Sequence, residues 1–194
     1  KTCDVLATSV RYEGMKRLGL SYEDVATIRP DIVYVHAAGF GSDGPYAGEP
    51  AYDDLIQSAS GMADILPRTD GNPAPRLLPT VVADKVSGLF FSQAVTAALL
   101  HRARTGEGQF VEVPMLECVT SFLLVEHLYD NVFEPATGQW GYQRIINPNR
   151  KPYKTKDGYI GLLPYTDRQW DQFFDAAGFG EQVKTDPRFA DYAS

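Results

Sequence analysis

The sequence contains little cysteine and little histidine. Its two cysteines, Cys3 and Cys118, form no C-x-x-C pair, which excludes both a disulfide framework and a zinc ribbon. The three histidines, His36, His101 and His127, fall on different expected elements with no carboxylate or thiol at ligand spacing. We therefore predict that the chain binds no metal. The scarcity of cysteine and the lack of a leader pattern lead us to expect a reducing, cytoplasmic compartment.

Long apolar runs and excess positive charge are also missing. The longest apolar segment is interrupted by Ser92, Gln93 and Thr96, and it is shorter than the roughly 20 residues that cross a bilayer. We therefore expect a soluble protein with no membrane partner. The 25 acidic residues outnumber the 18 basic ones, for a net charge of −7. A chain with this charge repels a polyphosphate backbone, so nucleic-acid binding is not expected.

Strand and helix patterns alternate through the first 133 residues. A β-favouring run at 5–10 is followed by a helical pattern at 11–18, and Ser21 with Asp24 resembles the capping box of a second helix. The apolar run at 32–37 has the length of a strand buried on both faces. This strand–helix–strand succession predicts an α/β layer.

Further elements are expected along the chain. A short helix at 52–60 precedes a proline-rich loop at 67–79. A long helix begins near Asp84, and a strand at 110–113 leads into an apolar helix at 116–128.

A shift in composition after residue 133 predicts a domain boundary. We expect 1–133 to belong to a large α/β domain, and 134–194 to form a linker and the start of a smaller α+β domain. Within this tail, Asp157-Gly158 between β-favouring residues predicts a hairpin, and Thr166 begins a helix.

Asp84 can be interpreted in two ways. An aspartate at the start of a helix is most often an N-cap, which stabilises by about 0.5 to 2 kcal/mol. Asp84 also follows the proline-rich loop and lies beside small residues, a setting in which a carboxylate could meet a ligand. A carboxylate with an intrinsic pKa of about 3.9 is ionised at neutral pH and can act as a nucleophile without a general base.

A glycine-rich turn and two basic clusters could bind phosphate groups. The turn at 39–44 follows a buried strand, where open α/β sheets bind ligands, but it matches no complete phosphate-binding motif and can equally be a simple tight turn. The first basic cluster is Arg11, Lys16 and Arg17; both clusters can also be solvated faces. The second cluster consists of Arg144, Arg150, Lys151, Lys154 and Lys156.

Several motifs follow one another in order between residues 4 and 117. They are RLGLSY at 17–22, GFGSDGPY at 39–46, YD at 52–53, QSASG at 57–61, VADKVSG at 82–88 and AALLHRARTGEGQ at 97–109. In this order they resemble the class III CoA-transferases of the CaiB/BaiF type. The resemblance implies an open, mostly parallel sheet flanked by helices, with residues 1–133 forming part of the CoA-binding domain and a smaller α+β segment in the tail.

The resemblance also implies an enzyme that moves CoA from an acyl-CoA donor to a carboxylic acid. Asp84 would carry CoA as a thioester intermediate, and amides at the start of its helix are our candidates for oxyanion donors. The family implies no tightly bound cofactor and an interlocked homodimer. The positions that match CoA contacts in the family are Ser9, Val10, Arg11, Arg17, Ala38, Gly39 and Phe40.

This sequence departs from the family pattern at two places. The usual Asn-Phe-Arg-Pro-Gly is replaced by SVRYE at 9–13, and the glycine run over the active site is reduced to Gly138 and Gly141.

Two alternative functions stay open. Acyl-CoA racemases of similar fold use a His-Asp pair, but Tyr52 stands where the histidine would be, and a phenol with an intrinsic pKa near 10 is a poor base at neutral pH. A transferase is therefore favoured. Family members are also longer and begin with another strand–helix unit, so the chain could be a truncated, catalytically silent fragment.

Overall fold

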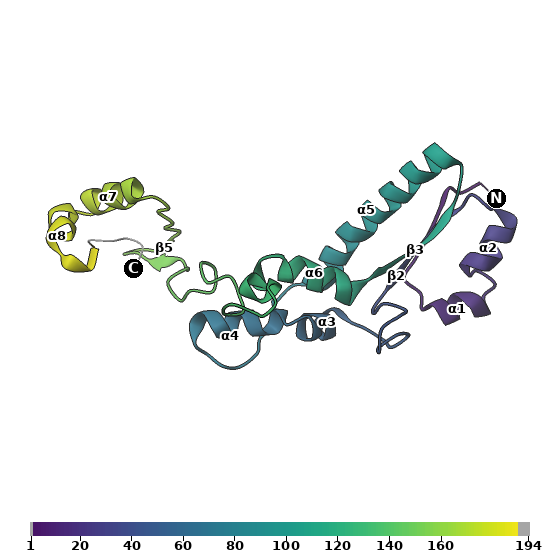
Figure 1. Cartoon of the computed structure of the whole chain (residues 1–194), viewed down its shortest axis with the longest axis horizontal. Helices are drawn as coiled ribbons and strands as arrows, with labels where there is room; N and C mark the ends of the chain where they lie inside the picture. The colour runs from purple at the N-terminus through teal and green to yellow at the C-terminus, as the bar shows by residue number, and fades with distance from the viewer. Residues whose placement is uncertain (1, 190–194) are drawn as a thin grey trace. The chain divides into compact units, whose positions relative to one another are not determined.

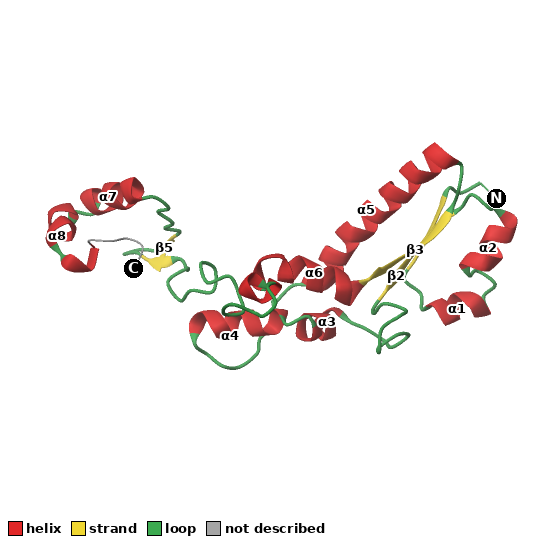
Figure 2. Cartoon of the chain, in the orientation of Figure 1, coloured by secondary structure: helices red, strands yellow, loops and turns green. Residues whose placement is uncertain are grey.

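The computed structural model describes residues 2–189, and the chain divides into two compact units, Lys1–Asn147 and Pro148–Ser194 (Figure 1). The first unit holds a three-stranded parallel sheet and most of the helices, and the second holds a two-stranded hairpin and short helices (Figure 2). Among the described residues, no helix is both long enough and apolar enough to span a bilayer.

The sheet consists of β1 (Val5–Thr8), β2 (Val33–Ala38) and β3 (Gln109–Pro114), which lie in that order. Val33 of the central strand pairs with Val5 on one side and with Gln109 on the other. Two short helices, α1 (Tyr12–Arg17) and α2 (Tyr22–Ile28), connect β1 to β2. The predicted α/β fold with a parallel sheet is confirmed.

The two faces of the sheet are covered by different helices (Figure 1). On the face toward α1 and α2, the rings of Tyr12 and Tyr22 lie 5.4 and 5.7 Å from that of Phe110 on β3. The predicted capping box begins α2, since Ser21 and Asp24 each accept the other's backbone N–H at 3.2 Å. The opposite face packs against α5 (Val82–Thr105) through a valine-rich core.

A second core forms where α5 meets α3 (Asp53–Ala59), α4 (Ile65–Asp70) and α6 (Met115–His127). Its buried members are Ile56, Met62, Ala83, Val86, Val119 and Leu123. The prediction of a continuous loop over 67–79 is wrong at its start, because α4 includes Pro67 as its third residue. A proline is tolerated in the first helical turn, where the missing N–H has no intrahelical acceptor.

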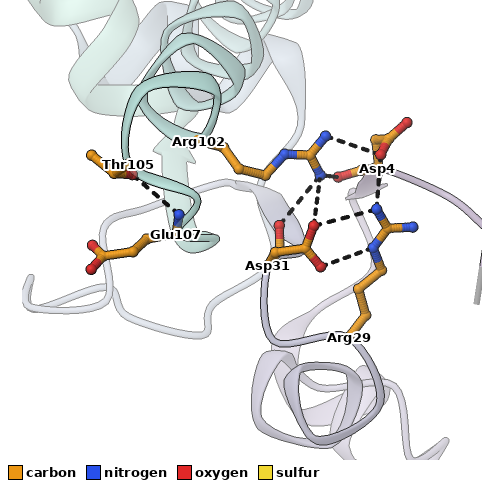
Figure 3. Close-up of polar contacts among 6 residues, drawn as sticks. All are labelled: Asp4, Arg29, Asp31, Arg102, Thr105 and Glu107. Atoms are coloured by element: carbon orange, nitrogen blue, oxygen red, sulfur yellow. Dashed lines mark hydrogen bonds and ion pairs between the residues drawn. The ribbon is translucent and has the colours of Figure 1, made fainter.

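Four charged side chains join the amino ends of β1 and β2 to the last turn of α5 (Figure 3). A carboxylate oxygen of Asp4 lies 2.9 Å from guanidinium nitrogens of both Arg29 and Arg102. Arg102 also donates to the carbonyl oxygens of Asp4 and Asp31, at 3.1 and 3.3 Å. The Arg29 guanidinium holds the pKa of the Asp31 carboxyl below its usual range. These contacts tie three segments that are far apart in sequence.

Residues 134–147 belong to the first compact unit. The ring of Trp140 stacks on that of buried His127 with centroids 5.5 Å apart, and the guanidinium of Arg68 lies 4.4 Å from the Trp140 ring centroid. The amide of Gly141 donates to the carbonyl of His127 at 2.9 Å. The compact unit therefore ends at residue 147, after the compositional boundary at 133/134. The division of the chain into domains at 133/134 stays a prediction.

The second unit contains the predicted hairpin, with β4 (Tyr153–Lys154) and β5 (Tyr159–Ile160) antiparallel. Thr166 caps α7 (Asp167–Ala176), as predicted, by accepting the amide of Gln169 at 3.3 Å. A further short helix, α8 (Gly180–Thr185), follows. Between residues 2 and 189 there are also three 3-10 helices: η1 (Met62–Asp64), η2 (Tyr129–Val132) and η3 (Pro187–Phe189).

Candidate active site

Two of the predicted CoA-binding segments lie at the carboxyl ends of neighbouring strands. Ser9, Val10 and Arg11 follow β1, whereas Ala38 ends β2 and is followed by Gly39 and Phe40. The Nε2 atom of His36, on β2, lies 3.0 Å from the carbonyl oxygen of Val10, which fixes the loop after β1 beside β2. Parallel strand ends are where open α/β sheets bind ligands.

Two arginines near these strand ends have free side chains. Arg11 immediately precedes α1, and Arg17 lies in the last turn of α1. Both side chains are exposed, and within residues 2–189 neither guanidinium has a hydrogen-bond or ion-pair partner. Lys16, the third member of the first basic cluster, pairs with Glu13 at 2.9 Å. The second basic cluster is divided, since Arg144 belongs to the first unit and the other four residues to the second.

The glycine-rich turn at 39–44 is held by carboxylates. The amide of Gly41 donates to Glu117 at 2.9 Å, and the amide and hydroxyl of Ser42 donate to Glu112 at 3.1 and 2.9 Å. These amides are therefore occupied. The backbone at Gly39 passes so close to Ala51 that a side chain does not fit: a Cβ atom at position 39 would lie only 2.3 Å from the Cβ of Ala51.

Asp84 is the third residue of α5, so the expectation that it is the N-cap is wrong. The helix begins two residues earlier because Val82 and Ala83 pack into the second core, where Ala83 is fully buried. The Asp84 side chain is exposed. Among the residues that the structure describes, its carboxylate has no hydrogen-bond or ion-pair partner.

Asp53, on α3, provides the cap of α5 instead. Its Oδ2 atom accepts the backbone N–H of Asp84 at 3.0 Å. The amides of Val82 and Lys85 donate to backbone carbonyls of residues 80 and 81, at 2.8 and 3.2 Å. Three of the first four amides of α5 are therefore occupied, and the expectation that this helix start supplies oxyanion donors is wrong for these three.

A buried amide completes this arrangement. Asp53 is 7% exposed, and its Oδ1 atom accepts from Nε2 of the fully buried Gln57 at 2.6 Å. The Oε1 atom of Gln57 accepts the amide of Leu78 at 2.8 Å, which fixes the loop that leads into α5. Ala51 lies against Gly39 two residues before α3, so the segment 51–57 connects the turn after β2 with the first turn of α5.

The sequence analysis did not identify Asp53 or Gln57 as site residues. Their i,i+4 spacing on one helix was the available signal, since such pairs share a face and can hydrogen-bond. Nothing in the spacing indicates that the pair faces α5, because the contact joins residues that are 31 positions apart.

A cavity of about 250 Å³ lies on the α1–α2 side of the sheet. The hydroxyl of Tyr12 donates to Glu23 at 2.8 Å and accepts the amide of Tyr22 at 3.1 Å, and burial raises the pKa of Tyr12 to about 12. Two carboxylates in the wall make this cavity unsuitable for CoA phosphates. It is lined by Tyr12, Tyr22, Glu23, Ser42, Phe110 and Glu112.

Comparison with known proteins identifies the family. The model of CoA-transferase family III matches residues 1–194, so the chain belongs to this family. The resemblance inferred from the ordered motifs is thereby confirmed. A solved structure described as a CAIB/BAIF family protein from Brucella suis has a TM-score of 0.78 at 29% identity, over 97% of this chain and 49% of that one.

Two curated relatives carry transferase names. The chain is 30% identical over 193 residues to succinate–glutarate CoA-transferase of Agrobacterium fabrum, which covers 98% of this chain and 47% of the relative. It is 32% identical over 191 residues to acetyl-CoA:oxalate CoA-transferase of Acetobacter aceti, with 98% and 49% covered. The chain therefore spans about half the length of the curated relatives it matches.

Proposed function

We propose that the protein transfers CoA from an acyl-CoA donor to a carboxylic acid through a thioester on Asp84. The observation that carries this proposal is the contrast between a fixed backbone and a free side chain at Asp84. Its backbone is held by Asp53, while its exposed carboxylate has no partner within the described residues. The names of the relatives support CoA transfer as the class of reaction.

The reaction proceeds in two matched halves. A carboxylate oxygen of Asp84 attacks the thioester carbonyl of the donor, and the tetrahedral adduct breaks its C–S bond, which releases CoA as a thiolate and leaves a mixed anhydride of Asp84 and the donor acid. The thiolate attacks the Asp84 carbonyl and releases the donor acid, which leaves CoA esterified to Asp84. The acceptor carboxylate then repeats the two steps in reverse and leaves as its CoA ester. Covalent catalysis of this kind divides one difficult exchange into easier steps.

CoA binds at the carboxyl ends of β1 and β2 in this proposal. Arg11 and Arg17 are suited to its phosphates, because an arginine fork matches phosphate geometry and both guanidiniums lack partners in the described chain. Phe40 is half-buried beside the core that contains Ala83, which brings this loop close to the first turn of α5. The remaining proposed contacts are Ser9, Val10, Ala38 and Gly39.

A homodimer is part of the proposal. Exposed apolar side chains on α5 and α6 support it, since Leu89, Phe122 and Val125 are 69%, 55% and 83% exposed. Burying such side chains against another surface is favourable. Light scattering on the complete gene product tests this, and a monomeric mass at micromolar concentration would contradict it.

The covalent intermediate can be detected directly. The complete gene product is incubated with acetyl-CoA or succinyl-CoA, digested, and analysed by mass spectrometry. We expect a CoA adduct on the peptide that contains Asp84, and no adduct in Asp84→Asn. The exposed, unpaired side chain makes this substitution a clean test, because it removes no hydrogen bond within the described chain and costs less than about 1 kcal/mol of helix-terminus stabilisation.

Other outcomes would contradict the proposal. An adduct on another residue would move the nucleophile elsewhere. Exchange of the α-hydrogen of the acyl group with deuterated water, without an adduct, would favour the racemase alternative.

A further inference from the structure

We propose that Asp53 is a positioning residue for Asp84: it caps α5 from a neighbouring helix and thereby keeps the Asp84 carboxylate free to react. This inference rests on the proposed function, since it assigns a role to a second carboxylate in the same site. The proposal is based on the two hydrogen bonds of Asp53 and on the contrast in burial between the two aspartates.

Acidic side chains at the third position of a helix ordinarily interact with the free amides of the first turn. Asp84 occupies that position, yet its own amide donates to Asp53 instead. One amide of the first turn, that of Asp84, is therefore satisfied by a residue that is 31 positions away in sequence. Among the described residues, the Asp84 carboxylate makes no hydrogen bond to the backbone of its own helix.

The partner of Asp53 determines its orientation. Gln57 presents Nε2 to Oδ1 of Asp53 and Oε1 to the amide of Leu78, so each end of the amide has a distinct role. The same Nε2 lies 3.4 and 3.3 Å from the carbonyls of Leu78 and Thr80. If the Gln57 amide were flipped, its NH₂ group would face the N–H of Leu78, and neither could accept a hydrogen bond. Gln57 therefore makes its hydrogen bonds in only one orientation of the amide. Asp53 is thereby required as an acceptor on both oxygens.

Burial also argues for a specific role. Asp53 and Gln57 are 7% and 0% exposed, and no cation contacts Asp53 among the described residues. A buried carboxylate is expensive unless its oxygens are hydrogen-bonded, and here both accept an N–H. The arrangement makes the first turn of α5 rigid, and small displacements of a reacting group lower rates strongly.

The test exchanges the acid and the amide. Asp53→Asn leaves one oxygen to accept from two donors, so one hydrogen bond is lost. In the double variant Asp53→Asn, Gln57→Glu, the oxygen of the new asparagine accepts from Asp84 while its amide nitrogen donates to the new glutamate, which still accepts from Leu78. The glutamate cannot donate to the carbonyls of Leu78 and Thr80, so these two long contacts of Gln57 are lost. We expect Asp53→Asn to slow formation of the Asp84 adduct by about 100-fold with little change in KM. We expect the double variant to recover most of this rate.

Two results overturn the inference. One is an unchanged rate in Asp53→Asn. The other is a folded double variant that protects the Asp84 amide again but stays as slow as the single one, because this would show that the hydrogen bond to that amide does not control the rate. If the single variant does not fold, the double variant is compared with the unmodified protein alone: a recovered rate together with a protected Asp84 amide supports the inference, and a slow rate in spite of a protected Asp84 amide overturns it.

A second readout separates this inference from the proposed function. Hydrogen exchange at the Asp84 amide does not depend on activity. We expect faster exchange there in Asp53→Asn and restored protection in the double variant. If the unmodified protein forms no adduct but exchange follows this pattern, the proposed function fails and the capping role stands. If the adduct forms and exchange is the same in all variants, the capping role fails alone.

Discussion

At the scale of single residues, the structure separates two aspartates that the sequence does not distinguish. Asp53 and Asp84 both occupy the first turn of a helix, but Asp53 is buried with both oxygens occupied and Asp84 is exposed. From the sequence, Asp84 was predicted as the nucleophile, and its alternative interpretation was a helix cap, a role that Asp53 fulfils instead. The error has a physical cause, because the helix start is fixed by a tertiary contact that leaves no mark on the local pattern.

Arg17 allows a test of phosphate binding at this scale. We expect Arg17→Ala to raise the KM for acyl-CoA about tenfold, since a hydrogen bond to a charged group is lost. The effect should shrink at high salt, because exposed charges are screened. Steady-state kinetics at low and high ionic strength measure both changes.

Lys16→Ala is the matched control on the same helical turn. Its amino group already pairs with Glu13, so the KM should stay near that of the unmodified protein. Equal effects of the two variants would assign the arginine to a general electrostatic surface rather than to a phosphate contact.

Two glycines in the same unit have opposite expected responses to alanine. Gly39→Ala places a Cβ 2.3 Å from that of Ala51, and we expect it to destabilise by about 1 to 3 kcal/mol. Gly88, in the middle of α5, has open space around a new Cβ, so Gly88→Ala should stabilise by about 0.5 to 1 kcal/mol. Urea unfolding of both variants measures the two free energies. A Gly39→Ala variant as stable as the unmodified protein would contradict the close approach at Gly39, and a destabilised Gly88→Ala variant would contradict the open space at Gly88.

At the scale of elements, the sequence predicts the individual helices and strands better than it predicts the contacts between them. The strands, the capping box of Ser21 and Asp24, the helix that begins at Thr166 and the tail hairpin follow from periodicity and turn residues, and the structure confirms them. The helix α4 was missed because its proline signals a break everywhere except in a first turn. The face that each helix buries depends on partners far along the chain, so the network of Asp53 and Gln57 was not predictable.

The charged contacts of Figure 3 should stabilise the packing of the last turn of α5 against the amino ends of β1 and β2. Arg102→Met removes donors to Asp4 and to the carbonyl of Asp31, and we expect it to destabilise the first unit by about 1 to 3 kcal/mol. Arg104→Met is the control, because Arg104 lies exposed in the same helical turn and has no partner in the described chain. Denaturant unfolding followed by circular dichroism compares them, and equal midpoints would show that the contacts contribute nothing.

At the scale of the whole molecule, composition and contacts suggest different ends for the first unit. The composition changes after residue 133, whereas residues 134–147 pack on α4 and α6 through Trp140 and the backbone of Gly141. Composition reports where the chain becomes polar, and a polar segment can still be bound to a core by a few aromatic and backbone contacts.

Truncation tests this difference. We expect a chain ending at residue 147 to melt at a higher temperature than one ending at residue 133, because the shorter chain exposes His127 and loses the Trp140 contacts. Thermal melts of the two polypeptides provide the measurement. Equal melting temperatures would favour the compositional boundary.

The stacking of Trp140 between Arg68 and His127 has a practical consequence. The sequence contains two tryptophans, and they are divided between the compact units, with Trp170 in the second. Each unit thus carries its own intrinsic fluorophore. Replacing either indole with phenylalanine leaves a single emission signal, so the loss of structure in each half of the chain can be followed separately without any attached dye.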